Sequence, residues 1–515
     1  MEQSEALGRL SPRGRLAGYA LAIFLSSAGV MALEIAAARL LAPYIGVSLY
    51  SWTAIIGVVL GGLSIGNWIG GVWADRGAKE SAAGWVLGAS ALACIGVLLM
   101  LTVVAPPLQR IEMSLLTASF LFVAALFFVP ALLLGVVTPL LTTLALRLDA
   151  RTGHVVGTLH ALGAFGSIVG TFVTGYFLIQ YFGTQAVILG TGAILGTLAL
   201  AFLWRSWKSL AALVVAALLL GGWTSARAGF QPMCERETSY FCIRVIDMSR
   251  EMPFGNARGL VLDHLMHGIN HEQLPRFLPS PYIHLMDEMI GLQANTVQGR
   301  ELRSFFAGGG AYTQPRALRA RFPDAEIVIA ELDPEVTQMA RAHMYYNGEG
   351  DRVIHSDARR ALAQMPEGHF DVIVGDVYHD ISIPYHLVTR EYAALVQSRL
   401  APGGLYVLNV IDAHPDPKLV KSIVKTYATV FGDVRVWLEY WPQRPERMTY
   451  VISMGGAAML PPTLYATEGP RREWIDVTGV LLSSGTPLDE LPVLTDNLAP
   501  VERLLTSLIF GELGR

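Results

Sequence analysis

Acidic side chains follow three predicted strands in the C-terminal half of the chain. Glu331 ends EIVIAE, Asp357 lies just beyond RVIH, and Asp376 follows FDVIVG. The carboxyl ends of parallel strands meet at one edge of a sheet, where open α/β folds bind ligands, so we expect the three acids to lie close together. The preceding strand, LRSFFA, runs into three glycines that would let a ligand approach the backbone: Gly308, Gly309 and Gly310.

The spacing of these residues favours a nucleoside ligand. Glu331 follows Gly308 by 23 residues, and an acid about 20 residues after a glycine turn can accept hydrogen bonds from ribose hydroxyls. The segment has neither GxGxxG nor a phosphate-binding lysine, which favours a phosphate-free nucleoside of the S-adenosylmethionine type over NAD. The alternative is a structural glycine turn with unrelated surface acids, which does not explain three acids at equivalent positions.

The elements that must position these residues follow from the pattern of residues 231–515. Strand and helix patterns alternate through 301–515, which predicts a Rossmann-like fold with a parallel sheet. Before it, residues 231–300 contain short alternating strands at 239–247 and 257–263. These predict a small antiparallel β-sheet and a segment at the substrate entrance.

Residues 1–230 have the composition of a membrane domain. They hold 12 Lys/Arg and 7 Asp/Glu, whereas the other 285 residues hold 26 and 35. A helix needs about 20 apolar residues to cross about 30 Å of hydrocarbon, and seven segments qualify. The fourth contains Pro130 and Pro139, so we expect it to be kinked or split into two spans. The predicted spans are 17–38, 52–74, 82–104, 115–146, 155–180, 184–204 and 209–226.

Positive charges in the short loops predict the orientation of these spans, because such charges favour the cytoplasmic side. They precede span 1 and follow spans 2, 4 and 6, whereas the opposite loops contain only Arg39 and Arg110. We therefore expect a multi-pass protein of the cell (inner) membrane, with a cytoplasmic N-terminus and an extracytoplasmic C-terminal half. Cells make S-adenosyl compounds in the cytoplasm, so three alternatives stay open: span 4 is two segments, the spans deliver a ligand, or the substrate is external.

Two features inside the spans bear on packing and function. Glycines at three- and four-residue spacing in 57–71 and 163–175 favour close helix packing over a pore. Glu34, Arg39 and Asn67 are polar groups at membrane depth and are functional candidates there. The alternative for Glu34 and Arg39 is an interfacial ion pair that holds the first helix.

Several motifs, in order and at approximate spacing, resemble those of the spermidine synthases, and the combination with many spans resembles the membrane-fused spermidine synthase-like proteins of bacteria. The tail PVLTDNLAPVE (492–502) fits that subgroup. The resemblance covers about 150 residues within 231–515. The motifs are LVLDHLMH (260–267), MDEM (286–289), FFAGGGAYT (305–313), ELDP (331–334), SDA (356–358) and FDVIVGDVYHD (370–380).

The resemblance implies a role for each matching position around the donor. Glu331 would bind the ribose hydroxyls, and Asp357 with Ala358 the adenine. The glycines Gly308, Gly309 and Gly310 would line the ribose and the thioether. The implied donor is decarboxylated S-adenosylmethionine or S-adenosylmethionine itself, and the site needs no metal.

The resemblance also implies an acceptor site for an amine or polyamine. Asp376 would orient and deprotonate the attacking amine, since an ammonium cannot attack until it loses a proton. Asp380, displaced by one residue from the family's second carboxylate, would be a second catalytic and substrate-binding acid. Asp287 and Glu288 are further acids for a cationic substrate. His267 stands where the family has Gln and would bind the cofactor.

Two departures bear on the reaction. The family's acid that holds the aminopropyl ammonium is Ala311 here, and its amine-positioning Tyr aligns with Met286. Aminopropyl transfer to an amine is our first expectation. Methyl or another alkyl transfer from S-adenosylmethionine is the alternative, because no carboxylate at 311 would repel its zwitterionic tail. A second alternative is a non-catalytic, nucleoside- or polyamine-sensing membrane transporter.

Histidines and cysteines add two further expectations. His264, His267, His271 and His284 form a cluster, but GIN within it favours a loop that lines the substrate entrance over a metal site. Cys234 and Cys242 flank a short segment beyond span 7, and two hairpin strands would bring them within bridging distance. A disulfide there needs an oxidising compartment, and the alternative is two free thiols. Cys94 is expected to pack inside span 3.

Composition and the resemblance together predict the binding partners of this chain. The C-terminal half is acidic and has no basic stripe with interleaved aromatic residues, which excludes nucleic acid. The expected partners are a small-molecule amine or polyamine and the lipid bilayer. A homodimer is left open.

Overall fold

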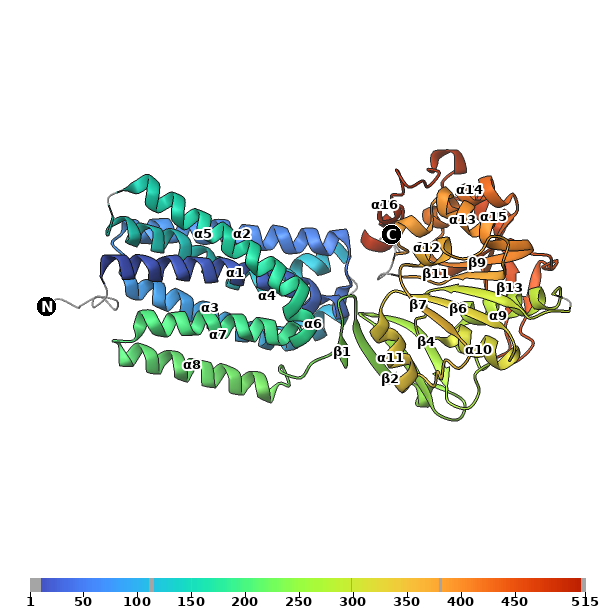
Figure 1. The fold of residues 1–515 in the computed structure, drawn as a ribbon, viewed down its shortest axis with the longest axis horizontal. Helices are drawn as coiled ribbons and strands as arrows, with labels where there is room; N and C mark the ends of the chain where they lie inside the picture. Colours follow the sequence, from blue (N-terminus) through green and yellow to red (C-terminus); the bar gives the residue numbers. More distant parts are fainter. Residues whose placement is uncertain (1–10, 111–114, 150, 298, 379–381, 511–515) are drawn as a thin grey trace. The chain divides into compact units, whose positions relative to one another are not determined.

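The computed structural model describes residues 11–110, 115–149, 151–297, 299–378 and 382–510 (Figure 1). Within it the chain forms two compact units, Met1–Cys242 and Ile243–Arg515. The short segment 231–242 therefore belongs to the helical unit.

The N-terminal unit is helical, and seven of its described helical segments are long and apolar enough to cross a membrane. The predicted spans thus have their expected number and places. Helix α4 runs without a break past Pro130 and Pro139, so the fourth predicted span is one helix and is not split into two. The helices are α1 (Pro12–Ile45), α2 (Leu49–Asp75), α3 (Glu80–Arg110), α4 (Leu115–Leu146), α5 (Thr152–Val173), the π-helix η1 (Thr174–Leu178), α6 (Ile179–Phe182), α7 (Thr184–Leu203) and α8 (Trp207–Ala226).

Glycines bring pairs of these helices into backbone contact. A Cβ atom on Gly135 of α4 would lie 2.6 Å from the carbonyl oxygen of Leu63 in α2, and one on Gly66 would collide with the Leu132 carbonyl. Likewise, a Cβ atom on Gly170 of α5 would collide with the carbonyl of Ala28 in α1. Small residues permit this approach, so the glycine pattern has the close-packing role predicted for it.

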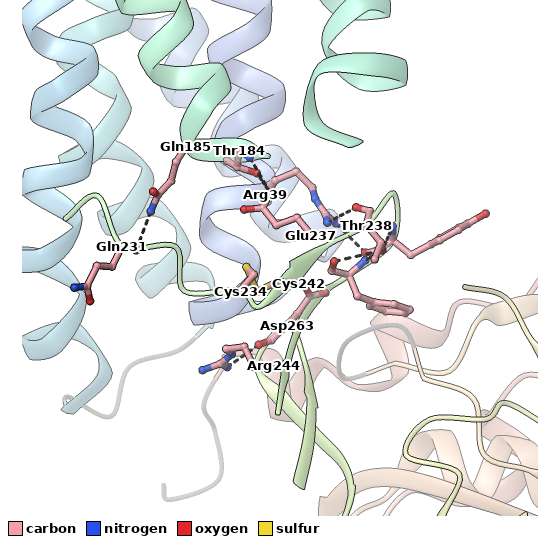
Figure 2. Close-up of a disulfide and its surroundings, with 12 residues drawn as sticks. Arg39, Thr184, Gln185, Gln231, Cys234, Glu237, Thr238, Cys242, Arg244 and Asp263 are labelled. Atoms are coloured by element: carbon pink, nitrogen blue, oxygen red, sulfur yellow. Dashed lines mark hydrogen bonds between the residues drawn. A yellow bond between two sulfur atoms is a disulfide. The ribbon is translucent and has the colours of Figure 1, made fainter. Parts of the chain in front are cut away.

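A disulfide-closed loop follows α8, with Cys234 joined to Cys242 and the short strand β1 (Arg236–Glu237) inside it. Figure 2 shows Arg39 of α1 reaching this loop: its guanidinium donates to the carbonyl oxygens of Thr238 at 2.7 Å and Tyr240 at 2.8 Å. The structure therefore gives Arg39 a partner in this loop rather than an ion pair with Glu34.

The same loop contacts the start of α7. The Glu237 carboxylate accepts hydrogen bonds from the amide of Thr184 at 2.8 Å and from its hydroxyl at 2.6 Å (Figure 2). A carboxylate is favourable at a helix N-terminus because the first amides have no partner within the helix. Together, Arg39 and Glu237 dock the loop onto α1 and α7.

The C-terminal unit begins with a small antiparallel sheet of β2 (Cys242–Asp247), β3 (Ala257–Leu262) and β4 (Leu265–His271). This matches the predicted small sheet. The expectation of a loop around the histidines is wrong, because β4 contains both His267 and His271. The glycine that suggested a loop, Gly268, lies next to an irregularity in the register of β3 and β4.

The main sheet has nine strands, in the order β12-β13-β10-β11-β9-β8-β5-β6-β7. Its parallel part is formed by β5 (Arg303–Ala307), β6 (Glu326–Glu331), β7 (Arg352–His355), β8 (Phe370–Gly375) and β9 (Leu400–His414). Its antiparallel part is formed by β10 (Val434–Leu438), β11 (Glu446–Gly455), β12 (Thr463–Tyr465) and β13 (Glu473–Asp476).

Helices alternate with the parallel strands, so the predicted Rossmann-like fold is confirmed. The longer ones are α9 (Pro281–Ala294), α10 (Thr313–Arg321), α11 (Pro334–His343), α13 (Arg390–Arg399) and α14 (Lys418–Phe431); the shorter ones are η2 (Ser249–Glu251), α12 (Ala358–Ala363), η3 (Tyr385–Leu387), α15 (Thr478–Ser483), η4 (Leu488–Glu490), α16 (Val501–Leu504) and α17 (Thr506–Phe510).

The order of the parallel strands reverses between β5 and β8. From β5 the chain builds outward through β6 and β7, and then returns to place β8 and β9 on the other side. In open α/β sheets the ends of two such strands leave a crevice where ligands bind. The fold therefore puts the glycine turn after β5 and the acid after β8 next to each other.

Candidate functional site

The glycine turn and Asp376 are locked together by backbone contacts at this reversal point. The amide of Asp376 donates to the carbonyl of Ala307 at 3.0 Å, and the amide of Gly308 donates to that of Ala330 at 2.9 Å. Gly308 has φ +91°, and a Cβ atom there would collide with the carbonyl of Asp376. Only glycine fits both the conformation and the space.

The Asp376 carboxyl lies near polar side chains from two other segments, β9 and α9. Burial raises its pKa to about 7, and the nearby polar side chains of Asn409 in β9 and Tyr282 in α9 oppose this rise. Tyr378 holds the backbone nearby, since its hydroxyl donates to the carbonyl of Asn409 at 3.2 Å and accepts from the amide of Ile411 at 2.7 Å. A carboxyl that titrates near neutrality suits general-base chemistry.

An unsatisfied acceptor lies in the same place. The amide oxygen Oδ1 of Asn409 is buried and has no hydrogen-bond partner within the described residues. A buried polar atom without a partner costs free energy, so this oxygen and the adjacent carboxylate form a pair of acceptors suited to an N–H donor such as an amine.

Glu331 ends β6 and supports the glycine turn. Its carboxylate accepts hydrogen bonds from the amides of Gly309 at 2.9 Å, Gly310 at 3.3 Å and Asp333 at 2.9 Å. The side chain is 6% exposed, and burial raises its pKa. A carboxylate has about four acceptor positions, so capacity for ribose hydroxyls is left.

Asp357 is the N-cap of α12, directly before the buried Ala358. Its Oδ1 accepts from the amide of Arg360 at 3.1 Å, and its Oδ2 lies 2.7 Å from Nε2 of His386. The hydrogen bond to His386 is the largest cause of the lowered pKa of Asp357. Sequence reasoning missed His386, which lies in the short helix η3 and in none of the matched motifs.

His267 lies beside the glycine turn, as expected. A Cβ atom on Gly310 would meet the His267 side chain at 3.7 Å. Burial lowers the pKa of His267 to about 4, so its ring is neutral at physiological pH and can accept or donate one hydrogen bond. Asp380, the second expected carboxylate, lies outside the described residues.

Ala311 faces the protein interior. It is 1% exposed, and a Cβ atom on Gly268 of β4 would lie 2.7 Å from the Ala311 methyl. The Asn270 side chain donates to the Ala311 carbonyl at 2.9 Å, which holds the turn against β4. A larger, charged side chain at 311 therefore has no room in this arrangement.

Two acids assigned to a cationic substrate have other partners. Asp287 Oδ2 lies 3.2 Å from Nη1 of Arg321, and Glu288 accepts from the amide of Thr467 at 2.7 Å and from its hydroxyl at 2.9 Å. Both are at most 5% exposed. These buried carboxylates hold α9 against its neighbours, and the substrate role predicted for them stays a prediction.

The structure also supplies the tyrosine that the motif comparison lacked. Met286 is fully buried, whereas Tyr282, four residues earlier on α9, reaches Asp376. Four residues is about one helical turn, so a hydroxyl from the same face of this helix still approaches the acid. A search for a tyrosine one helical turn before or after Met286 would have found Tyr282 in the sequence.

The histidine cluster is engaged in separate contacts. His271 Nε2 lies 2.9 Å from the Phe254 carbonyl, and His284 lies 3.6 Å from Glu288. Within the part of the chain that the structure describes, no three His, Cys, Asp or Glu side chains gather into a group that could hold a metal.

The chain is similar in sequence to the polyamine aminopropyltransferases. It is 27% identical over 213 residues to a probable polyamine aminopropyl transferase of Bifidobacterium longum. The matched region covers 38% of this chain and 47% of the relative. It is 30% identical over 156 residues to the polyamine aminopropyltransferase of Vibrio vulnificus, which covers 30% of this chain and 50% of the relative. The chain thus spans about half the length of these curated relatives.

Among solved structures, the chain is similar to a probable spermidine synthase from Corynebacterium glutamicum. The TM-score is 0.43 at 21% identity, over 53% of this chain and 99% of the other. No family model matches the chain.

Proposed function

We propose that this chain is a membrane-anchored transferase that moves an aminopropyl group from decarboxylated S-adenosylmethionine to an amine acceptor. The observation that carries the proposal is Asp376, which is held by backbone contacts against the Gly308 turn, has a pKa near 7 and lies beside the unsatisfied oxygen of Asn409. The sequence similarity to polyamine aminopropyltransferases supports the same reaction.

Asp376 acts as the base in this proposal. It accepts the proton that the acceptor ammonium must lose before its nitrogen can attack, while Asn409 Oδ1 accepts a second N–H hydrogen bond and orients the amine. A C–N bond forms and the C–S bond breaks, with the electron pair passing to sulfur. The sulfonium donor supplies a leaving group that departs as a neutral thioether.

The remaining residues hold the nucleoside of the donor. Glu331 accepts the ribose hydroxyls, Asp357 with Ala358 binds the adenine edge, and the three glycines leave space for the ribose and sulfur. His267, next to Gly310, closes the turn from β4. The described residues fit this group because the Glu331 carboxylate, which accepts three backbone amides, has acceptor capacity left.

A second candidate reaction is methyl transfer from S-adenosylmethionine. The burial of Ala311 against Gly268 favours it, because no carboxylate at 311 can bind an aminopropyl ammonium. The two reactions leave different products, methylthioadenosine or S-adenosylhomocysteine.

The test uses the full-length protein in lipid nanodiscs with each donor and a panel of linear amines. Mass spectrometry should detect methylthioadenosine and an aminopropylated amine, and Asp376→Asn should abolish turnover while donor binding, measured by calorimetry, stays. Turnover by Asp376→Asn would overturn the assigned base. S-adenosylhomocysteine as the only product would replace aminopropyl transfer by methyl transfer.

We also propose that the seven helices cross the cell membrane and leave the C-terminal unit outside the cytoplasm. The bias of Lys/Arg, the odd number of spans and the disulfide support this orientation. The test is labelling of intact cells with a membrane-impermeant maleimide after mild reduction. Labelling at Cys234 and Cys242 is expected, since Cys94 is buried in α3; labelling only after lysis would overturn it.

A further inference from the structure

The C-terminal tail, residues 492–502, is held against α13 and α14 by its backbone. The amide of Arg390, at the start of α13, donates to the carbonyl of Leu494 at 2.8 Å. The amide of Leu494 in turn donates to the hydroxyl of Thr426 in α14 at 2.8 Å. The tail motif is thus anchored to two helices of the C-terminal unit.

Asp496 of this tail forms an ion pair with Arg359 of α12. Nη1 of the arginine lies 2.7 Å from Oδ1, and Nη2 lies 2.7 Å from Oδ2. The hydroxyl of Thr389, the N-cap of α13, donates to Oδ1 at 2.8 Å. The guanidinium lowers the pKa of Asp496 to about 2, so the carboxylate is ionised at physiological pH. Partly exposed ion pairs contribute little to stability, whereas a two-pronged pair fixes orientation as well as distance.

Arg359 connects the tail to the residues proposed to bind adenine. Its Nη1 also donates to the backbone carbonyl of His386 at 3.1 Å, and Nε2 of His386 lies 2.7 Å from Oδ2 of Asp357. Asp357 caps the helix that carries Arg359, so these contacts close a ring. Asp496 thus holds the guanidinium that fixes the backbone of His386 opposite Asp357.

We propose that Asp496 is a positioning residue of the donor site, which acts through Arg359 to hold His386 against Asp357. The inference rests on the proposed function, in which Asp357 binds adenine. A carboxylate has about four acceptor positions, so Asp357 can accept the amino group of adenine besides its protein partners. Hypoxanthine has a carbonyl oxygen in place of that amino group, and a carboxylate repels it. A well-placed Asp357 therefore prefers adenosine compounds to inosine compounds.

The experiment measures nucleoside binding to the full-length protein in nanodiscs by calorimetry, with methylthioadenosine and methylthioinosine as probes. Asp496→Asn keeps the size of the side chain and removes its charge. It should raise the Kd of methylthioadenosine about fivefold, as for the loss of one hydrogen bond, and leave that of methylthioinosine within about twofold. The preference for adenine should therefore narrow. A general loss of stability would change both Kd values alike.

Further variants test whether Asp496 acts through the arginine. Arg359→Lys keeps the positive charge and loses the two-pronged geometry, so it should narrow the preference as well. In the Arg359→Gln background, Asp496→Asn should have no further effect. The matched control is Glu468→Gln, because the Glu468 carboxylate pairs with Arg276 at 2.7 Å and is 55% exposed. This control should leave both Kd values unchanged.

Three results would overturn the inference. They are an unchanged ratio of the two Kd values in Asp496→Asn, additive effects of the Asp496 and Arg359 variants, and equal binding of the two nucleosides by the wild type. Failure of the proposed reaction gives a different result, because both probes lack a transferable group. An adenine preference that depends on Asp496 would support the inference even in a protein that transfers no aminopropyl group.

Discussion

The hydroxyl of Tyr282, at the start of α9, lies near the carboxyl of Asp376, directly after β8, and influences its pKa. This proximity links the helix that precedes the first strand of the parallel sheet to the acid beside the glycine turn. Because the hydroxyl favours the ionised carboxylate, it lowers the pKa that burial raises. The pKa of Asp376 is therefore set by two opposing effects: burial raises it, and the Tyr282 hydroxyl of α9 lowers it.

The pH dependence of turnover should follow Asp376. A base is active when ionised, and its pKa is raised to about 7, so kcat/KM should fall about tenfold per pH unit below pH 7 and level off above it. Steady-state rates between pH 5 and 9 measure this. A profile that is flat through pH 7 would contradict the assignment.

The same pKa predicts a pH-dependent stability. The folded-state pKa lies above the unfolded value of about 3.9, so the stability that the protonated carboxyl contributes is lost as pH rises from about 4 through 7. Asp376→Asn cannot ionise and should have a higher Tm than the wild type at pH 8, with a smaller difference at pH 5. Thermal melts at the two pH values check the sign.

Tyr282→Phe should shift the acidic limb of the rate profile to higher pH. Removal of the hydroxyl deletes one of the two polar groups that lower the pKa of Asp376, so the base is protonated over a wider range. The loss of turnover should be largest at pH 6 and small at pH 9. The matched control is Tyr465→Phe on the exposed side of β12, whose profile should equal that of the wild type.

Ala311→Asp should destabilise the protein without creating an ammonium site. The Ala311 methyl contacts Gly268 inside the protein, and an unpaired buried carboxylate costs a few kcal/mol. We expect a lower Tm and no gain in affinity for decarboxylated S-adenosylmethionine. Ala457→Asp, at an exposed position, is the control and should leave Tm within about one degree; tighter donor binding by Ala311→Asp would show that the site rearranges to admit the acid.

His386→Asn should weaken donor binding through Asp357. Loss of the 2.7 Å contact removes the main partner of that carboxylate, and about 1 kcal/mol corresponds to a roughly fivefold higher KM for the donor. kcat should change less, because Asp376 is untouched. In a double-mutant cycle, Asp357→Asn and His386→Asn should be non-additive; additive effects on KM would show that the two side chains act separately.

Replacement of Cys234 and Cys242 by serine should lower the free energy of unfolding by about 2–3 kcal/mol, from the loop-closure entropy of a short ring. A reducing agent should lower the stability of the wild type by the same amount and leave the serine variant unchanged. Chemical denaturation of the nanodisc-bound protein, followed by tryptophan fluorescence, measures both. An equal response of the two proteins to the reducing agent would mean that the bridge is not formed.

Local patterns in the sequence determined the two-part architecture. Runs of apolar residues predict the seven helices because crossing a bilayer depends on length and composition alone. Alternation of strand and helix predicts the parallel sheet, and the positions of Glu331, Asp357 and Asp376 after successive strands place them at one edge. The two cysteines were close enough along the chain for their pairing to be predicted as well.

Contacts between distant segments were decided only by the tertiary structure. Tyr282 reaches Asp376 because α9 packs beside β8, and His386 reaches Asp357 because a short helix returns to the start of α12. The burial of Ala311 against β4 and the partners of Asp287 and Glu288 have the same origin. A residue's type and spacing state what chemistry it can do, whereas its partners, burial and pKa depend on neighbours that only folding brings together.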